Sequence, residues 1–190
     1  PVIRYLLENN ALTNVQDSSG ASPLHEAVRY GRYEIAQLLL QASADPNARD
    51  NLGKTPILLI MPEEQRAQLY SLLLNKGADI SVKDMYGDTV LHTATMTTVP
   101  VDILKTLVSA GADINARNKE GVTPLAIAIE NNVIDHIRFY ADNGADINTK
   151  NTEGETPLTM ALKSSENLLE IIVNKNNVNS QDSDGNTPLN

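Results

Sequence analysis

The sequence predicts an α-rich repeat solenoid, and two recurring phrases are the basis of that prediction. The first phrase is a glycine followed two residues later by Thr or Ser, then by proline in most copies and an aliphatic residue. A period of 31 to 34 residues separates its opening glycines, which are Gly20, Gly53, Gly87, Gly121, Gly154 and Gly185. The second phrase, Gly-Ala-Asp-Ile, follows about two dozen residues later and starts at Gly77, Gly111 and Gly144. Such a period is typical of units that bury their apolar faces only by stacking.

Each unit begins with the signals of a short first helix. Ser22 followed by Pro23 is an N-cap residue followed by the first helical position, where the missing N–H of proline costs nothing. In this clearest copy the helix is expected to run from Leu24 to Tyr30. One position holds a small residue that lets neighbouring helices approach closely; its copies are Ala27, Ala94, Ala128 and Ala161.

A second helix and an extended turn complete the unit. Gly31 supplies the sharp turn, and apolar residues then recur at helical spacing from Ile35 to Leu40. The glycines of the second phrase are expected to end their helices in the left-handed conformation. The Asp- and Asn-rich segment that follows is typical of a hairpin-like turn. In it, carboxylates are expected to accept bonds from nearby backbone N–H groups, at Asp17, Asp50, Asp84 and Asp182.

Together these phrases resemble the ankyrin repeat, and the resemblance covers essentially the whole chain. It implies an L-shaped unit of two antiparallel helices with a projecting β-hairpin, stacked as one solenoid over residues 1–190. Five full repeats are expected, with a partial repeat at each end. The boundaries are 1–16 for the first partial repeat, then 17–49, 50–83, 84–117, 118–150 and 151–181, and 182–190 for the last partial repeat.

Four departures from the pattern stand out. Pro62 and Pro100 interrupt repeats two and three, and we expect each to occupy the first position of its second helix. Ser43 replaces a helix-ending glycine, at a cost of about 1 kcal/mol if its backbone is left-handed. Asn176 holds the same place in the fifth repeat, which is short, rich in asparagine and expected to be the least stable.

Composition excludes several classes of protein. Cysteine is absent, so disulfides and thiolate metal sites cannot form. The formal charge of −9 argues against nucleic-acid binding and against adhesion to anionic membranes, both of which need a basic face. No apolar run approaches the roughly 20 residues that span a bilayer. Much of the acidity, however, lies at equivalent positions of the repeats, so it is weak evidence for a basic partner.

The sequence offers no catalytic motif, and we expect no enzyme, cofactor or metal site. There is no G-x-S-x-G, P-loop or calcium-loop pattern. His25 and His92 follow the Thr-Pro-Leu phrase, and the resemblance implies a structural hydrogen-bonding role between hairpins. His136 lies on a second helix and is expected to be solvated or semi-buried.

Apolar residues at expected loop tips are the candidate binding surface for a protein partner. Partners of ankyrin proteins usually dock on the concave side, which hairpin tips and first helices form. Three consecutive repeats place apolar residues at the tips, and two residues near the ends of first helices would extend the patch. These candidates are Leu52, Met85, Tyr86 and Val122 at the tips, with Tyr30 and Met96 on the helices. The alternative is that these side chains pack between neighbouring hairpins and contribute only stability.

The favoured function is therefore a non-catalytic protein–protein interaction module. Because both ends of the chain stop within a repeat, a second hypothesis is a regulatory or targeting segment of a larger enzyme, channel or secreted effector. We expect a monomer, with end-to-end association as the alternative state. A cytoplasmic location is the default, with a bacterial envelope protein or a secreted effector as alternatives.

Overall fold

The computed structural model describes residues 2–61, 67–164 and 166–173, and over these residues the chain is helical, with no strand. Within the described ranges each α-helix has seven to nine residues, and one short 3₁₀ helix interrupts the series. The elements are α1 (Val2–Glu8), α2 (Pro23–Arg29), α3 (Tyr33–Gln41), η1 (Pro56–Leu59), α4 (Ala67–Asn75), α5 (Val90–Met96), α6 (Val101–Ser109), α7 (Pro124–Glu130), α8 (Ile134–Asp142), α9 (Pro157–Ser164) and α10 (Glu166–Ile172).

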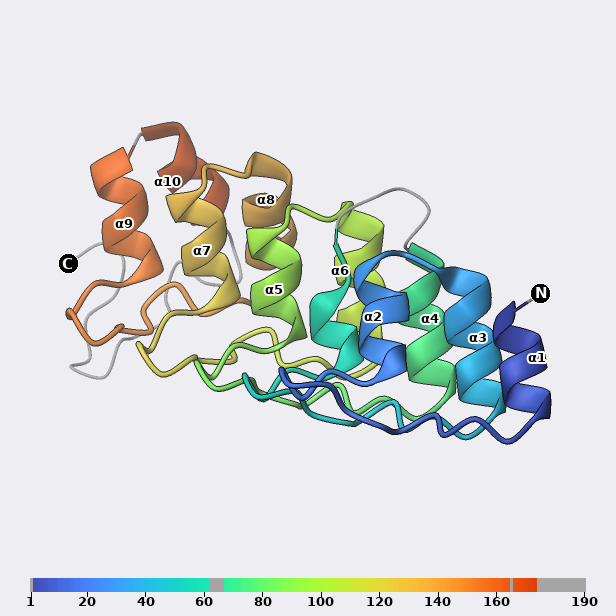
Figure 1. The fold of residues 1–190 in the computed structure, drawn as a ribbon. Helices are drawn as coiled ribbons and strands as arrows, with labels where there is room; N and C mark the ends of the chain where they lie inside the picture. Colours follow the sequence, from blue (N-terminus) through green and yellow to red (C-terminus); the bar gives the residue numbers. More distant parts are fainter. Residues whose placement is uncertain (1, 62–66, 165, 174–190) are drawn as a thin grey trace.

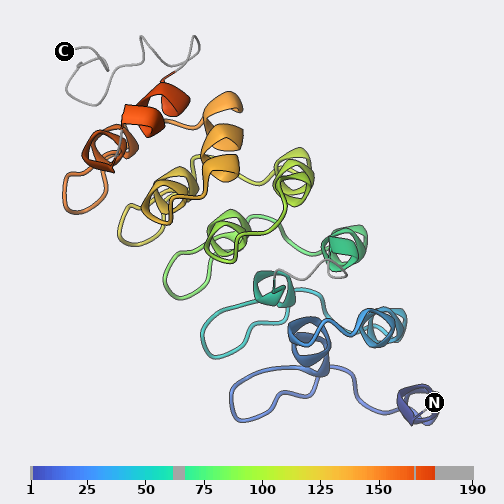
Figure 2. The same ribbon diagram turned by 90° about the horizontal axis from the view of Figure 1, so that it is seen from above.

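The helices form two parallel rows, as the solenoid prediction requires (Figure 2). The first helices α2, η1, α5, α7 and α9 make one row, and the second helices α1, α3, α4, α6, α8 and α10 make the other. All the long loops project to one side of the stack, beneath the first helices in Figure 1. We call the surface made by these loop tips and the first helices the inner face.

The first helices begin as their sequence predicts. The Ser22 hydroxyl caps α2 by accepting a bond from the backbone N–H of His25, and Thr123 caps α7 in the same way. The small residues of this row are fully or almost fully buried, which lets the helices stack closely: Ala27, Ala94, Ala128 and Ala161.

Repeat two departs from this pattern, because its first helix is only the four-residue 3₁₀ helix η1. Ile60 stands where the other repeats have the small alanine, and its backbone is extended, with φ −70° and ψ 115°. A β-branched residue at this crowded position and a proline two residues later both disfavour another helical turn. The expected helix start at Pro62 lies outside the described residues.

The backbone conformation of Ser43 confirms one expectation about the irregular repeats, and that of Pro100 corrects another. Ser43 is left-handed, with φ 64°, so it does carry the strain of the glycine position. Pro100 is the N-cap of α6 with extended ψ of 143°, and the helix starts at Val101, one residue later than expected. The Asn176 and Asp182 positions lie outside the described residues.

A repeated side-chain hydrogen bond joins four successive loops to the loop that follows each of them. Gln16 Nε2 donates to the carbonyl of Arg49 at 2.8 Å, and Arg49 Nη1 donates to that of Lys83 at 3.1 Å. Lys83 Nζ in turn donates to the carbonyl of Arg117 at 2.8 Å, and Arg117 Nη2 to that of Lys150 at 2.8 Å. In four consecutive units, the side chain at the same position therefore donates a hydrogen bond to a backbone carbonyl of the following unit. We call this series the carbonyl ladder.

The core is one continuous apolar cluster between the two rows. It extends from Leu24 in α2 to Ile172 in α10 and consists mainly of leucine, isoleucine, valine and alanine. Its largest fully buried side chains include Tyr70 and Tyr140. The Tyr140 hydroxyl lies 2.6 Å from Thr95 Oγ1 of α5, so this buried polar group has a partner.

Candidate functional site

The loop tips have a fixed shape because a carboxylate or amide oxygen closes each turn. Asp50 Oδ1 accepts from the backbone N–H groups of Leu52 and Lys54, and Asp84 and Asn118 make the equivalent pairs of bonds. The expected role of the recurring aspartates is therefore confirmed at the described positions. The expected hairpins are present as closed turns, although none of their residues is assigned to a strand.

Neighbouring loop tips are bonded to one another through their backbones. The Met85 N–H donates to the carbonyl of Leu52 at 2.8 Å, and the Lys119 N–H donates to that of Tyr86 at 2.9 Å. The corresponding bond joins Thr152 to Glu120 at 2.8 Å. These bonds give the tips a continuous edge, so residues of successive repeats lie side by side on the inner face.

Three of the predicted tip residues form one exposed apolar strip. Leu52 is 44%, Met85 46% and Tyr86 54% exposed, and the Leu52–Met85 backbone bond holds them together. Val122 is half-buried rather than exposed, and its carbonyl lies 3.0 Å from His92 Nε2. We call Leu52, Met85 and Tyr86 the tip strip.

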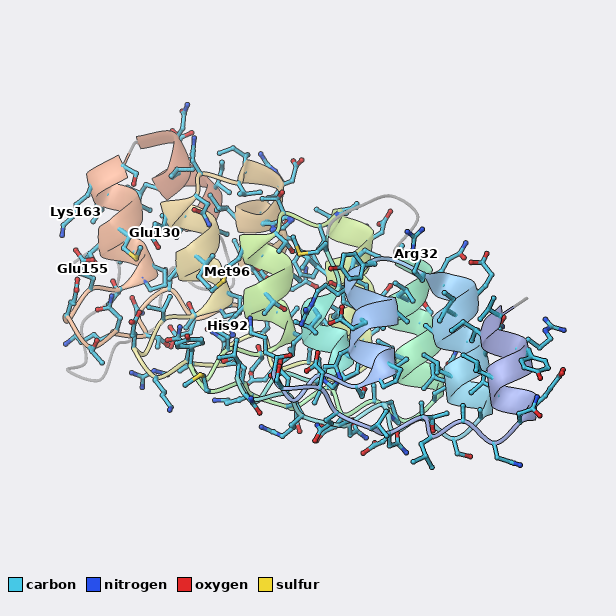
Figure 3. The ribbon with its side chains drawn as sticks, viewed as in Figure 1. Arg32, His92, Met96, Glu130, Glu155 and Lys163 are labelled. Carbon is cyan, nitrogen blue, oxygen red and sulfur yellow. The ribbon has the colours of Figure 1, made fainter. Side chains whose placement is uncertain are left out.

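Tyr30 and Met96 are exposed too, but they lie at the far ends of their helices. Tyr30 follows α2 and Met96 ends α5, and they are 61% and 45% exposed. A seven-residue helix is about 10 Å long, so each is about that distance from the loop end of its own helix. Figure 3 shows Met96 above His92 on α5. Met96 belongs to the inner face but does not join the tip strip directly, whereas Tyr30 lines a separate hollow with residues of α1 and α3.

A hollow that the sequence did not predict lies on the inner face, between repeats four and five. It has a volume of about 330 Å³ and opens between α7, α9 and their loops. Val122, Ala126 and Met160 supply its apolar surface. Four carboxylates also line it: Glu120, Glu130, Glu153 and Glu155. The sequence places three of these glutamates at loop tips, and only stacking shows that Glu130 of the preceding helix joins them.

His25 and His92 link neighbouring repeats, as the family resemblance implies. In each, Nδ1 accepts the backbone N–H of the capping residue, at 3.0 Å from Ser22 and 3.1 Å from Thr89. The proton must therefore sit on Nε2, which donates to the Lys54 carbonyl at 3.1 Å or to the Val122 carbonyl at 3.0 Å. Burial lowers the pKa of His92, which favours this neutral form.

His136 is buried, so the expectation of a solvated or semi-buried side chain is wrong. Only 2% of it is exposed, and its Nε2 lies 2.6 Å from the carbonyl of Val99 in the preceding repeat. Its Nδ1 is buried without a hydrogen-bond partner. Burial lowers the pKa of His136, and the imidazole therefore acts as a neutral packing and bonding group.

The described residues contain no group of three or more His, Asp or Glu side chains placed to hold a metal ion. None of their helices is long and apolar enough to cross a membrane.

Family comparisons agree with this architecture. The family model for ankyrin repeats in three copies matches residues 58–151 and 125–190, and the single ankyrin repeat model matches residues 19–51. The chain belongs to the ankyrin repeat family. Ankyrin repeats are in general protein-interaction modules without catalytic activity.

Curated relatives share short stretches of this ankyrin chain. Neurogenic locus notch homolog protein 1 of Homo sapiens is 43% identical over 53 residues, which are 28% of this chain and 2% of that protein. The Ankyrin repeat and LEM domain-containing protein 1 homolog of Caenorhabditis elegans is 48% identical over 52 residues, which are 27% of this chain and 7% of that protein. The 2-5A-dependent ribonuclease of Mus musculus is 43% identical over 58 residues, 30% of this chain and 8% of that protein. The chain thus matches only a small part of each relative's length.

Proposed function

We propose that this ankyrin chain is a non-catalytic module that binds a protein partner on its inner face. The tip strip is the observation that supports this proposal best. Its three side chains are each about half exposed, and backbone bonds between loops hold them side by side. Exposed apolar clusters are typical of interaction sites, and Tyr and Met are favoured there.

The alternative, that the tip strip only packs loops together, predicts a different response to mutation. About half of each side chain is covered, so truncation removes some packing in either case. A binding strip predicts loss of a partner with a small change in stability. A packing strip predicts loss of stability with no change in binding.

Affinity capture from the source cell's lysate, with mass spectrometry, tests the proposal. The wild-type chain is compared with the double variant Met85→Ala, Tyr86→Ala after circular dichroism has shown that both are folded. We expect a protein that the wild type captures and the double variant does not. Melting temperatures measured on the same samples separate binding from packing.

A matched control removes apolar surface elsewhere. Tyr5 and Leu12 are 66% and 76% exposed and lie outside the loop tips of the full repeats. The double variant Tyr5→Ala, Leu12→Ala should capture the same protein as the wild type. Unchanged capture by the tip-strip variant, or equal loss in both double variants, would overturn the inner-face proposal.

A second candidate function is a regulatory or targeting segment of a larger protein. The relatives support this candidate, because the stretch that matches this chain is 8% or less of the length of each of the three relatives described above. The length of the intact open reading frame in the source genome tests it. For the module itself we propose a cytoplasmic location, which fractionation of cells expressing the tagged protein would check.

A further inference from the structure

We propose that the hollow between α7 and α9 binds an arginine side chain presented by an extended, basic segment of the partner. This inference rests on the proposed inner-face function and adds the chemistry of the partner to it. We call this hollow the acidic hollow. Figure 3 shows three of the side chains concerned: Glu130 at α7, and Glu155 and Lys163 at α9.

The acidic hollow is complementary in charge to a basic side chain. Four glutamates line the acidic hollow, and no basic residue lines it. Lys163, at its edge, pairs with Glu155 alone. Within the described part of the chain, the side chains of Glu120, Glu130 and Glu153 have no ion pair or hydrogen bond. Three carboxylates therefore face solvent around one concavity, and a cation brought between them would gain attraction from each.

The apolar surface of the hollow excludes a simple ion as its best occupant. Val122 and Met160 are half-buried, and Ala126 is buried at the base of the hollow. A long basic side chain buries an aliphatic stem along such a surface while its charged head stays with the carboxylates. The hollow thus matches both parts of a lysine or arginine side chain.

Geometry favours arginine over lysine. Glu120 and Glu153 come from neighbouring loops, and Glu130 comes from the far end of α7, so the carboxylates line different sides of the hollow. The planar guanidinium has five donors and bonds carboxylates in pairs, whereas an ammonium acts as a point charge. A volume of about 330 Å³ lies at the lower limit of ligand pockets, which suits one side chain and not a large ligand.

The bonded loop tips form a continuous edge, and a partner segment that follows this edge would be extended. The Thr152 N–H donates to the carbonyl of Glu120, so the two loops below the hollow are held together. The acidic hollow lies beside the tip strip, because the loop that carries Glu120 is bonded to Tyr86 through the Lys119 N–H. An extended segment that crosses the tip strip with apolar side chains would reach the hollow with a basic one.

Peptide titration of the whole chain tests the proposal directly. The probe is a fluorescein-labelled peptide of alternating arginine and serine, and its control has citrulline in place of each arginine. Citrulline keeps the overall shape of arginine but has a neutral urea in place of the charged guanidinium, with fewer N–H donors and one carbonyl acceptor. We expect binding of the arginine peptide that weakens between 50 mM and 500 mM salt, and little binding of the citrulline peptide.

Paired variants locate the binding. Glu130→Gln with Glu153→Gln removes two exposed carboxylates from the hollow without a change in side-chain shape. Glu34→Gln with Glu170→Gln makes the same change in net charge on the row of second helices. We expect the first pair to weaken peptide binding roughly three- to tenfold, the effect of losing two partly exposed ion pairs. The second pair should leave it unchanged.

The outcomes distinguish this proposal from the proposed function on which it rests. Equal binding of both peptides, no binding of either, or equal weakening by both pairs of variants would overturn the arginine site. If the tip-strip variant still loses its captured protein in that case, the inner-face function stands without the arginine site. Amide shifts in isotope-labelled protein confined to residues 120–160 would support the proposed location, and shifts confined to residues 17–60 would contradict it.

Discussion

At the scale of single residues, buried histidines decide how well neighbouring repeats are joined. His25 and His92 each satisfy a capping residue in their own repeat and a carbonyl in the next. Repeat two has Leu58 in this position, and the Thr55 hydroxyl beside it is buried without a partner. In repeat two, the absence of the histidine therefore coincides with an unsatisfied capping hydroxyl and with the loss of one bond to the next repeat.

Burial of His92 and His136 predicts that stability falls in weak acid. Their pKa values in the folded chain lie below the usual 6.5, so below pH 6.5 the unfolded chain binds more protons than the folded chain. The unfolding free energy should therefore fall as the pH drops from 6.5 towards the lowered values. Aspartates such as Asp17, whose pKa is lowered from 3.8 chiefly by the hydrogen bond from Ser19, titrate further down. Melting temperatures at pH 7.5 and 5.0 measure the effect.

A His136→Gln variant assigns part of the effect to one side chain. The glutamine amide can still donate to the Val99 carbonyl, but it does not titrate. We expect this variant to lose less melting temperature between pH 7.5 and 5.0 than the wild type does. An identical loss in both proteins would show that His136 does not contribute.

At the scale of the elements, loop glycines allow the loops to approach one another. Gly87 has φ 83°, and a Cβ there would lie 2.8 Å from the backbone nitrogen of Lys119 in the next loop. Gly111 ends α6 with φ 98° and has open space around the same position. Gly87 is therefore required both for its left-handed backbone and for the close approach of the next loop. Gly111 is required for its left-handed backbone alone.

This difference predicts unequal costs for the same substitution. Gly111→Ala should lower the unfolding free energy by about 1–2 kcal/mol, the cost of a left-handed backbone for alanine. Gly87→Ala carries that cost and must also displace the loop of residues 118–121, so its loss should be clearly larger. Urea denaturation of both variants measures the two values. Equal losses would mean that the loops can separate without cost.

Sequence reasoning predicts these elements well where one repeat contains all the information. The caps, the buried alanines and the left-handed Ser43 follow from local residue chemistry. The burial of His136 does not, because its partner, the Val99 carbonyl, lies 37 residues earlier and meets it only in the stack. The acidic hollow is missed for the same reason, since repeats four and five both contribute to it.

At the scale of the whole molecule, one junction between repeats has fewer bonds than its neighbours. Asn47 and Asn115 each bond the next repeat twice, through a glycine carbonyl and an aspartate N–H. Ser81 occupies the same place in repeat two, and its hydroxyl bonds Asp79 of its own loop. Because repeat two also lacks the bridging histidine, its junction with repeat three should be where the stack opens first.

A Ser81→Asn substitution should strengthen this junction. Asparagine there can reach the Gly111 carbonyl and the Asp113 N–H, as its counterparts do, and we expect a gain of about 1 kcal/mol in unfolding free energy. The reverse change, Asn47→Ser, should cost a similar amount at a junction that has these bonds. Hydrogen exchange of the amides on either side of residue 84 should slow only in Ser81→Asn. No gain, or slowing elsewhere, would contradict the weak-junction interpretation.

The carbonyl ladder gives the stack a direction. Every donor, from Gln16 to Arg117, reaches the unit that follows it in sequence, and none of these bonds runs backwards. A ribosome releases the amino-terminal repeats first, so each donor emerges before the carbonyl that it will meet. During synthesis each ladder donor therefore lacks its carbonyl partner until the next repeat has left the ribosome.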